Sequence, residues 1–417
     1  MSSEAGSLER AHLAELHALA AERGIAGYRL LRREELIAAL RGEAEAPARP
    51  QRERVRLLAG PEAESEAGRE EPTEDVTGVL ELTPQRYGFI RLGGLGGGGE
   101  DVYISASQVR RCELREGDEV SGPARPPRRG ERHRALVHVD RVNGAEPQLG
   151  RPRFEDLTAV APSRRIALDR DPGDVLLRAV DLLAPLALGQ RVLVRAAPRS
   201  GRTTLLRSIA RAVAAGGEAE VIVLLVDERP EEVTAWREAV PAAELASAPA
   251  DMRPADQVRT ARLALERARR RAESGAHAVL LVDSLSRLAV AAGDVAEVKR
   301  LFGSGRALAG DAAGSLTVVA TVVAGADDGG AAERAVATTE SALVTLAPEL
   351  ARAGVVPALV PAECSVAAEE SLREAQELEA ARRLRSLLAD LDPREAAGLL
   401  RERIEATASN RDLLAAL

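Results

Sequence analysis

A glycine-containing turn between an apolar run and a helical pattern is the first segment of this chain that could do chemistry. The segment reads RVLVRAAPRSGRTTLLRSIARAVA, and its APRSGRT part follows the P-loop pattern A/G-x4-G-K-[ST]. Backbone N–H groups of such a loop and the following helix N-terminus hold phosphates, and Thr203 would offer its hydroxyl to Mg²⁺. Arg202 stands where the pattern has lysine, and its planar fork is not equivalent to a compact ammonium. The alternative interpretation is a plain glycine and proline turn.

Two later apolar runs end in carboxylates. VIVLLVDERPEEVT ends its run with Asp227 and Glu228, and AVLLVDS ends its run with Asp283. The carboxyl ends of parallel strands line the ligand crevice of an open α/β sheet. Asp283 would hold Mg²⁺, and Glu228 would act as general base on an attacking water. Each acidic residue alone could be a turn former or a helix cap, so the prediction depends on the three signals occurring in P-loop order.

A cluster of aromatic residues indicates a second kind of chemistry. Tyr87, Phe89 and Tyr103 lie within seventeen residues, and Tyr87, Phe89 and Arg91 share one face if YGFIR is a strand. Exposed aromatics with a flanking arginine can stack single-stranded bases. RPPRRGERHR at 125–134 adds five arginines against one glutamate. The alternative is that the aromatics form the core of the domain.

The elements that position these residues follow from apolar periodicity. Nearly continuous β-branched runs at 191–196, 220–227, 278–283 and 315–323 are typical of parallel strands buried on both faces. Helical patterns such as 255–274 lie between them, and 371–417 also has a helical pattern. This alternation predicts an α/β domain with a mostly parallel sheet.

The first part of the chain has a different texture. Five short β-like runs from VTGVLEL to RALVHVDRV predict a small OB-type barrel. Leucines at helical spacing predict a helical hairpin in 7–42, and an acidic, proline-containing stretch after it predicts a disordered linker. The expected order is a helical unit at 1–43, a linker at 44–75, a barrel at 76–145, a connector at 146–165 and the α/β domain with C-terminal helices at 166–417.

Composition limits the possible classes of protein. The 417 residues suffice for about three domains, and a net charge of −8 excludes a uniformly basic nucleic-acid binder. Lys299 is the only lysine, so arginine carries nearly all the positive charge. Two cysteines, Cys112 and Cys364, exclude a disulfide scaffold and fit a reducing cytoplasm. We find no signal-peptide core and no apolar run that approaches a membrane span.

Taken together, these motifs resemble the transcription termination factor Rho family over nearly the whole chain. GIAGYRLLRREELIAAL is similar to the family's small N-terminal helical domain. YGFIR, EDVYISASQVRR, LREGD, GERH and VNG resemble its cold-shock-like RNA-binding domain, in order. FEDLTAVAPSRR, GQRVLV, APRSGRT, LLVDERPEEVT and LLVDSLSRLA resemble its RecA-like motor, and LLVDERPEEVT is the most specific of these strings.

The resemblance implies a homohexameric ring that binds nascent single-stranded RNA and uses ATP with Mg²⁺ to release the transcript from RNA polymerase, with elongation factors as further partners and no membrane. It implies an RNA site made of Arg86, Tyr87, Gly88, Phe89, Ile90, Arg91, Asp101, Tyr103, Glu131, Arg132 and His133. It implies a nucleotide site made of Gly189, Gln190, Arg191, Arg199, Ser200, Gly201, Arg202, Thr203, Thr204 and Arg229, with Glu228 and Arg202 catalytic and Thr203 and Asp283 on the metal.

The chain departs from the family pattern mainly in the motor. Arg202 replaces the P-loop lysine, and VVPALVPAECSVAAEESL carries no arginine to serve as the family's arginine finger. Val356 stands where the family stacks an aromatic on adenine. The pore loop after DSLSRLA is short, and the second, AVATTES, has no lysine. In the barrel, His133 stands where the family usually has tyrosine.

Two hypotheses follow. The chain is an RNA-stimulated ATPase and translocase that terminates transcription. Alternatively, it is a catalytically silent or impaired paralogue that binds RNA, alone or in a mixed ring with an active Rho. A secretion or rotary ATPase of the same superfamily is disfavoured by the barrel and by DERPEEV.

Overall fold

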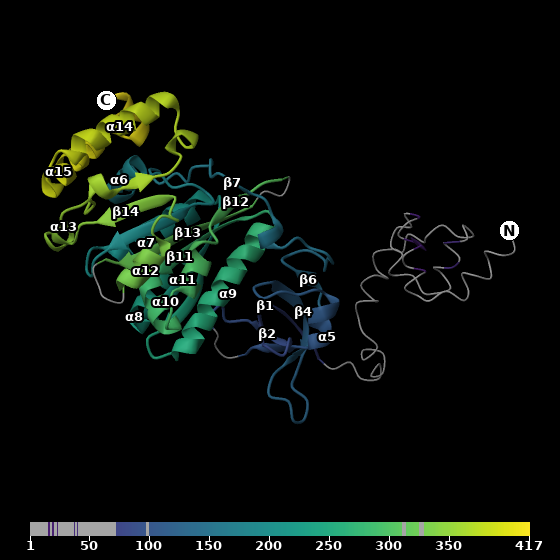
Figure 1. Ribbon diagram of the computed structural model, residues 1–417. Coiled ribbons are helices and arrows are strands. Elements are labelled where there is room, and N and C mark those ends of the chain that lie inside the picture. The colour runs from purple at the N-terminus through teal and green to yellow at the C-terminus, as the bar shows by residue number, and fades with distance from the viewer. Residues whose placement is uncertain are drawn as a thin grey trace. The chain divides into compact units, whose positions relative to one another are not determined.

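Figure 1 shows a computed structural model of the chain, which describes residues 16, 19, 20, 23, 37, 40, 72–96, 100–310, 314–324 and 329–417. The chain divides into two compact units, 1–69 and 70–417. In the first, Leu16, Ala20, Ile37 and Leu40 are buried, and the Arg23 guanidinium donates to the Leu40 carbonyl at 2.7 Å. The rest of the predicted helical unit, linker residues 44–71 and three glycines at 97–99 lie outside the described residues.

A closed five-stranded barrel begins the second unit, as the sequence predicts. The strands pair in the order β1-β2-β3-β5-β4, and β1 pairs again with β4 to close the ring. The fifth predicted run splits into β5 and β6, and β6 pairs outside the ring on β4. The elements are β1 (Glu74–Leu82), β2 (Gly88–Arg91), β3 (Val102–Ile104), α5 (Ala106–Arg111), β4 (Glu119–Arg125), β5 (Ala135–Leu136) and β6 (Arg141–Val142).

The α/β domain is built on a sheet of order β10-β9-β11-β13-β8-β14-β15, parallel except at β15. The strands are apolar on both faces because separate apolar clusters cover the two sides. All four predicted strands are confirmed, and two of them keep their predicted ends. The strands are β7 (Ala159–Val160), β8 (Arg191–Ala196), β9 (Glu220–Glu228), β10 (Glu244–Pro249), β11 (His277–Asp283), β12 (Arg306–Leu308), β13 (Ser315–Val323), β14 (Ala342–Leu346) and β15 (Ser365–Val366).

Helices cover both faces of this sheet (Figure 1). The predicted helix at 255–274 is α9, which starts at Pro254 because proline suits the first helical position. None of the described helices combines the length and the apolar character needed to cross a membrane. The helices are α6 (Val175–Leu183), α7 (Arg202–Gly216), α8 (Pro230–Ala239), α9 (Pro254–Glu273), α10 (Leu285–Ala292), α11 (Ala296–Phe302), α12 (Gly329–Val336), α13 (Pro348–Arg352), α14 (Ala375–Ala389), α15 (Pro393–Glu405) and α16 (Asn410–Ala415).

A buried arginine anchors the C-terminal helices to α6. The Arg178 side chain is fully buried and donates to the carbonyls of Ile404 and Thr407, both at 2.8 Å, and to Asn410 Oδ1 at 3.1 Å. Asn410 in turn donates to Asp181 Oδ2 at 2.9 Å. The predicted helices of 371–417 therefore complete the core of the α/β domain.

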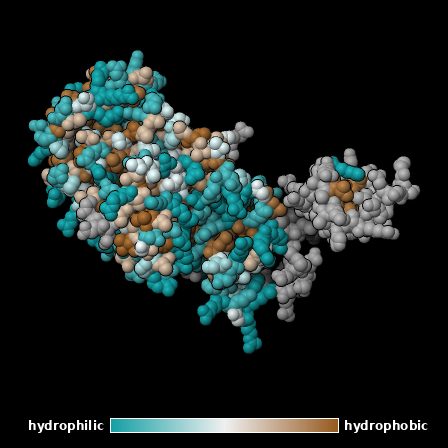
Figure 2. Space-filling view, in the orientation of Figure 1, coloured by the Kyte–Doolittle hydropathy of each residue, from teal (hydrophilic) through white to brown (hydrophobic). Residues whose placement is uncertain are grey.

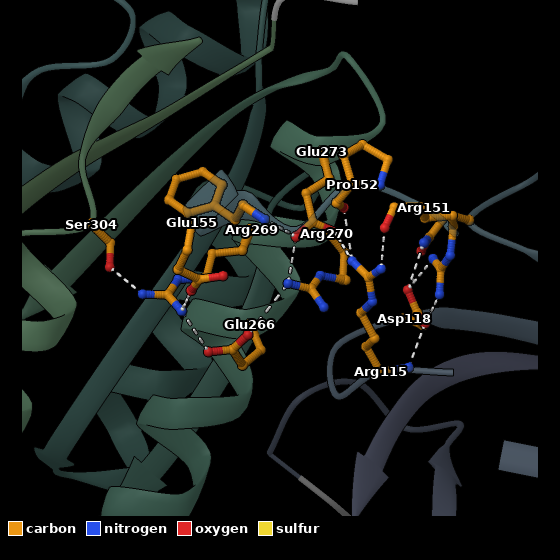
Figure 3. A network of polar contacts seen from close by, with 12 residues as sticks. Arg115, Asp118, Arg151, Pro152, Glu155, Glu266, Arg269, Arg270, Glu273 and Ser304 are labelled. Atoms are coloured by element: carbon orange, nitrogen blue, oxygen red, sulfur yellow. Dashed lines mark hydrogen bonds and ion pairs between the residues drawn. The ribbon is translucent and has the colours of Figure 1, made fainter. Parts of the chain in front are cut away.

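Ionic contacts fasten the barrel and the connector to α9 (Figure 3). Asp118 of the barrel is fully buried and accepts two hydrogen bonds from Arg151 of the connector, at 2.7 and 2.8 Å. Glu273 of α9 accepts from the Phe154 N–H at 2.7 Å and pairs with Arg115 at 3.4 Å. Removing one member of such a pair would leave an uncompensated buried charge, so these contacts hold the barrel and the connector against α9.

Gly117 marks the closest approach of the barrel to α9. Its φ is +82°, and a Cβ there would lie 2.4 Å from the Arg267 backbone nitrogen. Arg267 itself is buried and pairs with Glu119 at 2.6 Å and Glu244 at 3.0 Å. A side chain at 117 would therefore push the barrel away from these ion pairs.

We predict that Gly117→Ala lowers the free energy of unfolding by about 2–5 kcal/mol, because it adds a backbone clash to the strain of a left-handed residue. Gly130→Ala is the matched control: its φ is +94°, but no atom lies within 4 Å of the added Cβ. The control should lose only about 1–2 kcal/mol. Urea denaturation followed by circular dichroism measures both, and equal losses would contradict the close approach.

Glu116 lies at the same junction, and burial together with Glu266 and Glu81 raises its pKa to about 7. The folded chain thus holds a proton that the unfolded chain releases near pH 4.5, so stability falls as pH rises between these values. We predict that Glu116→Gln gains roughly 1–2 kcal/mol over the parent chain at pH 8 and little at pH 5, after allowing for solvent screening. Denaturation at both pH values tests this. Glu402→Gln, at an exposed position of α15, should show no such pH-dependent gain.

Candidate functional site

A pocket of about 490 Å³ opens at the carboxyl ends of the central strands. The loop between β8 and α7 forms one wall, and residues that follow β9, β11 and β13 form the others. Its lining residues are Ala197, Pro198, Arg199, Gly201, Arg202, Thr203, Thr204, Glu228, Arg229, Glu232, Arg287 and Val323. Five of the six predicted nucleotide-site residues between 199 and 204 thus line a single cavity, together with Glu228.

The loop has the backbone geometry of an anion cradle. Arg199 and Gly201 both have positive φ, 62° and 90°, which turns the chain sharply into α7. The Ser200 hydroxyl donates to the Ala197 carbonyl at 2.7 Å and closes the turn. Since α7 is 15 residues long, its free N–H groups and its dipole favour an anion at this end.

The two predicted carboxylates lie at the ends of neighbouring strands: Glu228 lines the pocket, and Asp283 contacts the lining residues Arg202 and Thr203. Asp283, at the end of β11, is 1% exposed and accepts hydrogen bonds from Thr203 at 3.3 Å and Thr321 at 3.1 Å. Glu228, at the end of β9, is buried, whereas Asp227 beside it is exposed. Burial and the charge of Asp283 raise the pKa of Glu228, against the opposing charges of Arg287 and Arg202. A raised pKa suits a carboxylate that accepts a proton from water.

Arg202 joins both carboxylates. Its Nε lies 2.9 Å from Asp283 Oδ1, without the alignment of a hydrogen bond, and its Nη2 lies 3.7 Å from Glu228 Oε1. The guanidinium therefore lies between the two acids and the loop at 197–201, which we call the phosphate loop, and does not extend into solvent.

The predicted Mg²⁺ ligands do not fit that ion as they are arranged here. The Thr203 hydroxyl directs its proton to Asp283 Oδ2, and Arg202 lies against Oδ1. Mg²⁺ needs oxygen lone pairs in near-octahedral geometry, and a permanently charged guanidinium on the same carboxylate opposes a dication. Thr203 and Asp283 do lie together, as predicted, but the Thr203 hydroxyl and both Asp283 oxygens already have partners within the protein.

Arg287 and Glu232 are pocket residues that the sequence motifs did not indicate. Arg287 forms a close ion pair with Glu228 from the first turn of α10, and its position four residues after Asp283 was the available signal. Glu232 pairs with Arg207 at 2.6 Å, and the Arg207 guanidinium lies over the ring of Trp236, 5.4 Å from its centroid. Arg229, a predicted site residue, lies at the pocket mouth with its side chain 76% exposed.

Gly189, Gln190 and Arg191 do not line the pocket, which does not fit their predicted nucleotide role within a single chain. Gly189 and Gln190 directly precede β8 and Arg191 begins it, so the strand separates them from the loop between β8 and α7 by about 16 Å. Instead, Arg191 donates to the carbonyls of Thr339 at 2.5 Å and Gly305 at 2.8 Å. Arg191 therefore stabilises the segment that contains AVATTES, at 335–341.

The barrel aromatics form an exposed cluster and do not belong to the barrel core. Tyr87, Phe89 and Tyr103 have ring centroids 5.7–6.2 Å apart, and His133 lies 5.0 Å from Phe89. All are partly or fully exposed, whereas Gly88 and Ile90 point inward. The barrel core is aliphatic, so the core interpretation of the aromatics is wrong. We call Tyr87, Phe89, Tyr103 and His133 the aromatic platform.

Three of the predicted RNA contacts, Arg91, Asp101 and Glu131, are held in ion pairs. Arg91 bonds Glu81 at 2.7 Å and forms a close pair with Asp101. Glu81 also forms an ion pair with Arg259 of α9, at 2.9 Å. These pairs position Arg91 beside the aromatic platform and tie the platform strand to the α/β domain.

The predicted basic segment projects from the barrel between β4 and β5. Glu131 forms a bidentate pair with Arg125, at 2.7 and 2.8 Å, and this contact lowers its pKa to about 2. Arg132 is exposed beside it, and Arg86 is exposed in the β1–β2 turn at φ 66°. Hydrophilic residues cover the loop that projects at the lower end of the barrel (Figure 2). The platform thus has charged neighbours that can meet a phosphate backbone.

Comparison with known proteins matches these regions separately. A family model described as Rho termination factor, RNA-binding domain, matches residues 76–148, and Rho termination factor, N-terminal domain, matches 7–46. The model described as ATP synthase alpha/beta family, nucleotide-binding domain, matches 177–304.

Relatives that carry the name transcription termination factor Rho cover most of the chain. The Bacillus subtilis protein is 38% identical over 76% of this chain and 73% of its own length. The Aquifex aeolicus protein is 33% identical over 98% of this chain and 94% of its own length. The Streptomyces lividans protein is 37% identical over 81% of this chain, which spans about half (51%) of that relative.

A solved ATPase from the type III secretion system of pathogenic bacteria has a similar fold. The TM-score is 0.51 at 19% identity, over 67% of this chain and 93% of that one. At this identity the likeness describes the fold alone.

Proposed function

The chain belongs to the transcription termination factor Rho family, and from that premise we propose that it binds nascent single-stranded RNA and uses ATP to release the transcript from RNA polymerase. In this proposal it works in the cytoplasm as a homohexameric ring or a mixed ring with another Rho, together with elongation factors. The aromatic platform is the single observation that carries the proposal, because these clustered, partly exposed rings lie outside the aliphatic core of the barrel.

The platform supports single-stranded RNA as the ligand. Bases stack on aromatic faces irrespective of their sequence, and phosphates pair with nearby arginines. Arg86 and Arg132 are exposed for that role, while Arg91 and Asp101 hold the platform strands in place. His133 would stack on or hydrogen-bond a base beside Phe89.

The pocket supports nucleoside triphosphate as the second ligand. The phosphate loop binds the anion, and Glu228 orients and deprotonates an attacking water. Arg202 and Arg287 hold Glu228 in place, and their charges can stabilise the transferring phosphoryl group.

A silent or impaired motor is the second candidate function. No arginine or lysine lies in the described segment 355–372, where the family supplies its finger, and Val356 there is 44% exposed. Loss of such a finger costs roughly 10³-fold or more in rate. In this case the chain binds RNA, alone or within a ring of active subunits, and modulates termination.

We predict that a Tyr87→Ala/Phe89→Ala double variant binds C-rich RNA at least about tenfold more weakly, since each stacked base contributes about 1–3 kcal/mol. Filter binding at fixed salt measures the dissociation constant. Phe89→Trp keeps an aromatic face and should retain RNA affinity. Unchanged binding by the double variant would show that RNA does not use the platform.

We predict that ATP turnover stimulated by poly(C) exceeds that of Glu228→Gln by at least about 10²-fold, because the amide cannot act as a base. Phosphate release by the full chain, with and without poly(C), measures this. Glu231→Gln, at an exposed position of α8 three residues after Glu228, should leave turnover unchanged. Equal turnover by the parent chain and Glu228→Gln would assign the chain to the second candidate function.

A further inference from the structure

We propose that the pocket binds a nucleoside triphosphate without a divalent cation, because the Arg202 guanidinium occupies the place on Asp283 that Mg²⁺ would take. The inference rests on the nucleotide binding proposed above and adds which chemical form of the nucleotide the pocket takes: the free polyphosphate anion and not its magnesium chelate.

The Asp283 carboxylate already has a donor at each of its oxygens. The carboxylate is buried: Oδ1 has Arg202 Nε at 2.9 Å and the Thr321 hydroxyl at 3.1 Å, and Oδ2 has the Thr203 hydroxyl at 3.3 Å. A metal could bind here only if Arg202 moved off the carboxylate and Thr203 turned its proton away. Thr203 would then lose its hydrogen bond to a buried carboxylate, and Arg202 would lose its charge contact.

The permanence of the arginine charge is the second step. A guanidinium does not deprotonate in proteins, so it cannot yield its place by losing a proton. A dication on Asp283 would lie a few ångströms from Arg202, and like charges at such a distance repel strongly outside bulk water. Glu228 offers no other ligand, because Arg287 forms a close ion pair with it.

The charge of the pocket wall is the third step. Four arginines line the cavity, against two glutamates; the six are Arg199, Arg202, Arg229, Arg287, Glu228 and Glu232. The N-terminus of α7 adds positive potential at the phosphate loop. The wall therefore carries more positive than negative charge, which favours a polyphosphate anion.

The experiment measures the affinity of the full chain for ATP by isothermal titration calorimetry, in excess EDTA and in excess Mg²⁺. We expect the two dissociation constants of the parent chain to agree within about twofold. Arg202→Lys frees Asp283, so its affinity should become at least about fivefold tighter with Mg²⁺ than with EDTA. Arg211→Lys makes the same change at an exposed position of α7 and should behave like the parent chain.

Arg202→Met provides a second variant that lacks the charge altogether. It should bind ATP at least about tenfold more weakly than the parent chain in EDTA, and Mg²⁺ should recover part of that loss. Thermal unfolding of each variant checks that it is folded.

The possible outcomes distinguish a failure of this inference from a failure of the proposed function. Tightening of parent-chain binding by tenfold or more with Mg²⁺ overturns the inference and leaves the nucleotide site intact. Absence of ATP binding in both conditions overturns the inference together with the nucleotide part of the proposed function, while RNA binding is still measured on its own. Equal Mg²⁺ dependence in the parent chain and Arg202→Lys also overturns it.

Discussion

A carboxylate can be buried only where cations or hydrogen-bond donors neutralise it, and this constraint organises the molecule. With a single lysine in the chain, arginine meets the requirement almost everywhere. Asp118 has Arg151, Asp181 has Arg165, and Glu369 has Arg373 and Arg385. In the pocket, Asp283 has Arg202. Ion pairs between arginine and a buried carboxylate therefore stabilise the fold at three places, and a fourth lies at the centre of the candidate site.

The structural ion pairs and the ion pair in the site differ in how well their hydrogen bonds are aligned. Asp118 receives two hydrogen bonds from one guanidinium in aligned geometry, and so does Asp181. The Arg202 contact to Asp283 is short but unaligned, and its far nitrogen faces a second acid at 3.7 Å. An arrangement held by charge more than by directed hydrogen bonds can be rearranged by a ligand with a large negative charge, which distinguishes a binding site from a structural ion pair.

The sequence predicted the elements better than it predicted the partners of side chains. The strand 315–323 was predicted to the residue because a continuous β-branched run between turn residues leaves few alternatives. Glu228 and Asp283 lie near each other, as expected, because the carboxyl ends of neighbouring parallel strands meet at one edge of the sheet. The ion pairs of Arg91 with Glu81 and Asp101 could not be predicted, because they depend on how the strands pack and not on a local sequence pattern. The same holds for Arg287 on Glu228, and for Arg191, which supports a loop and lies away from the nucleotide pocket.

The position of the chain's only tryptophan has a practical consequence. Trp236 is buried on α8 with the Arg207 guanidinium above its ring, and Arg207 is paired with Glu232 in the pocket wall. An indole excited state responds to charges beside its ring, and this one is linked through two side chains to the cavity. The protein thus carries an intrinsic fluorophore at its pocket, with no second indole to obscure the signal and no need for a label.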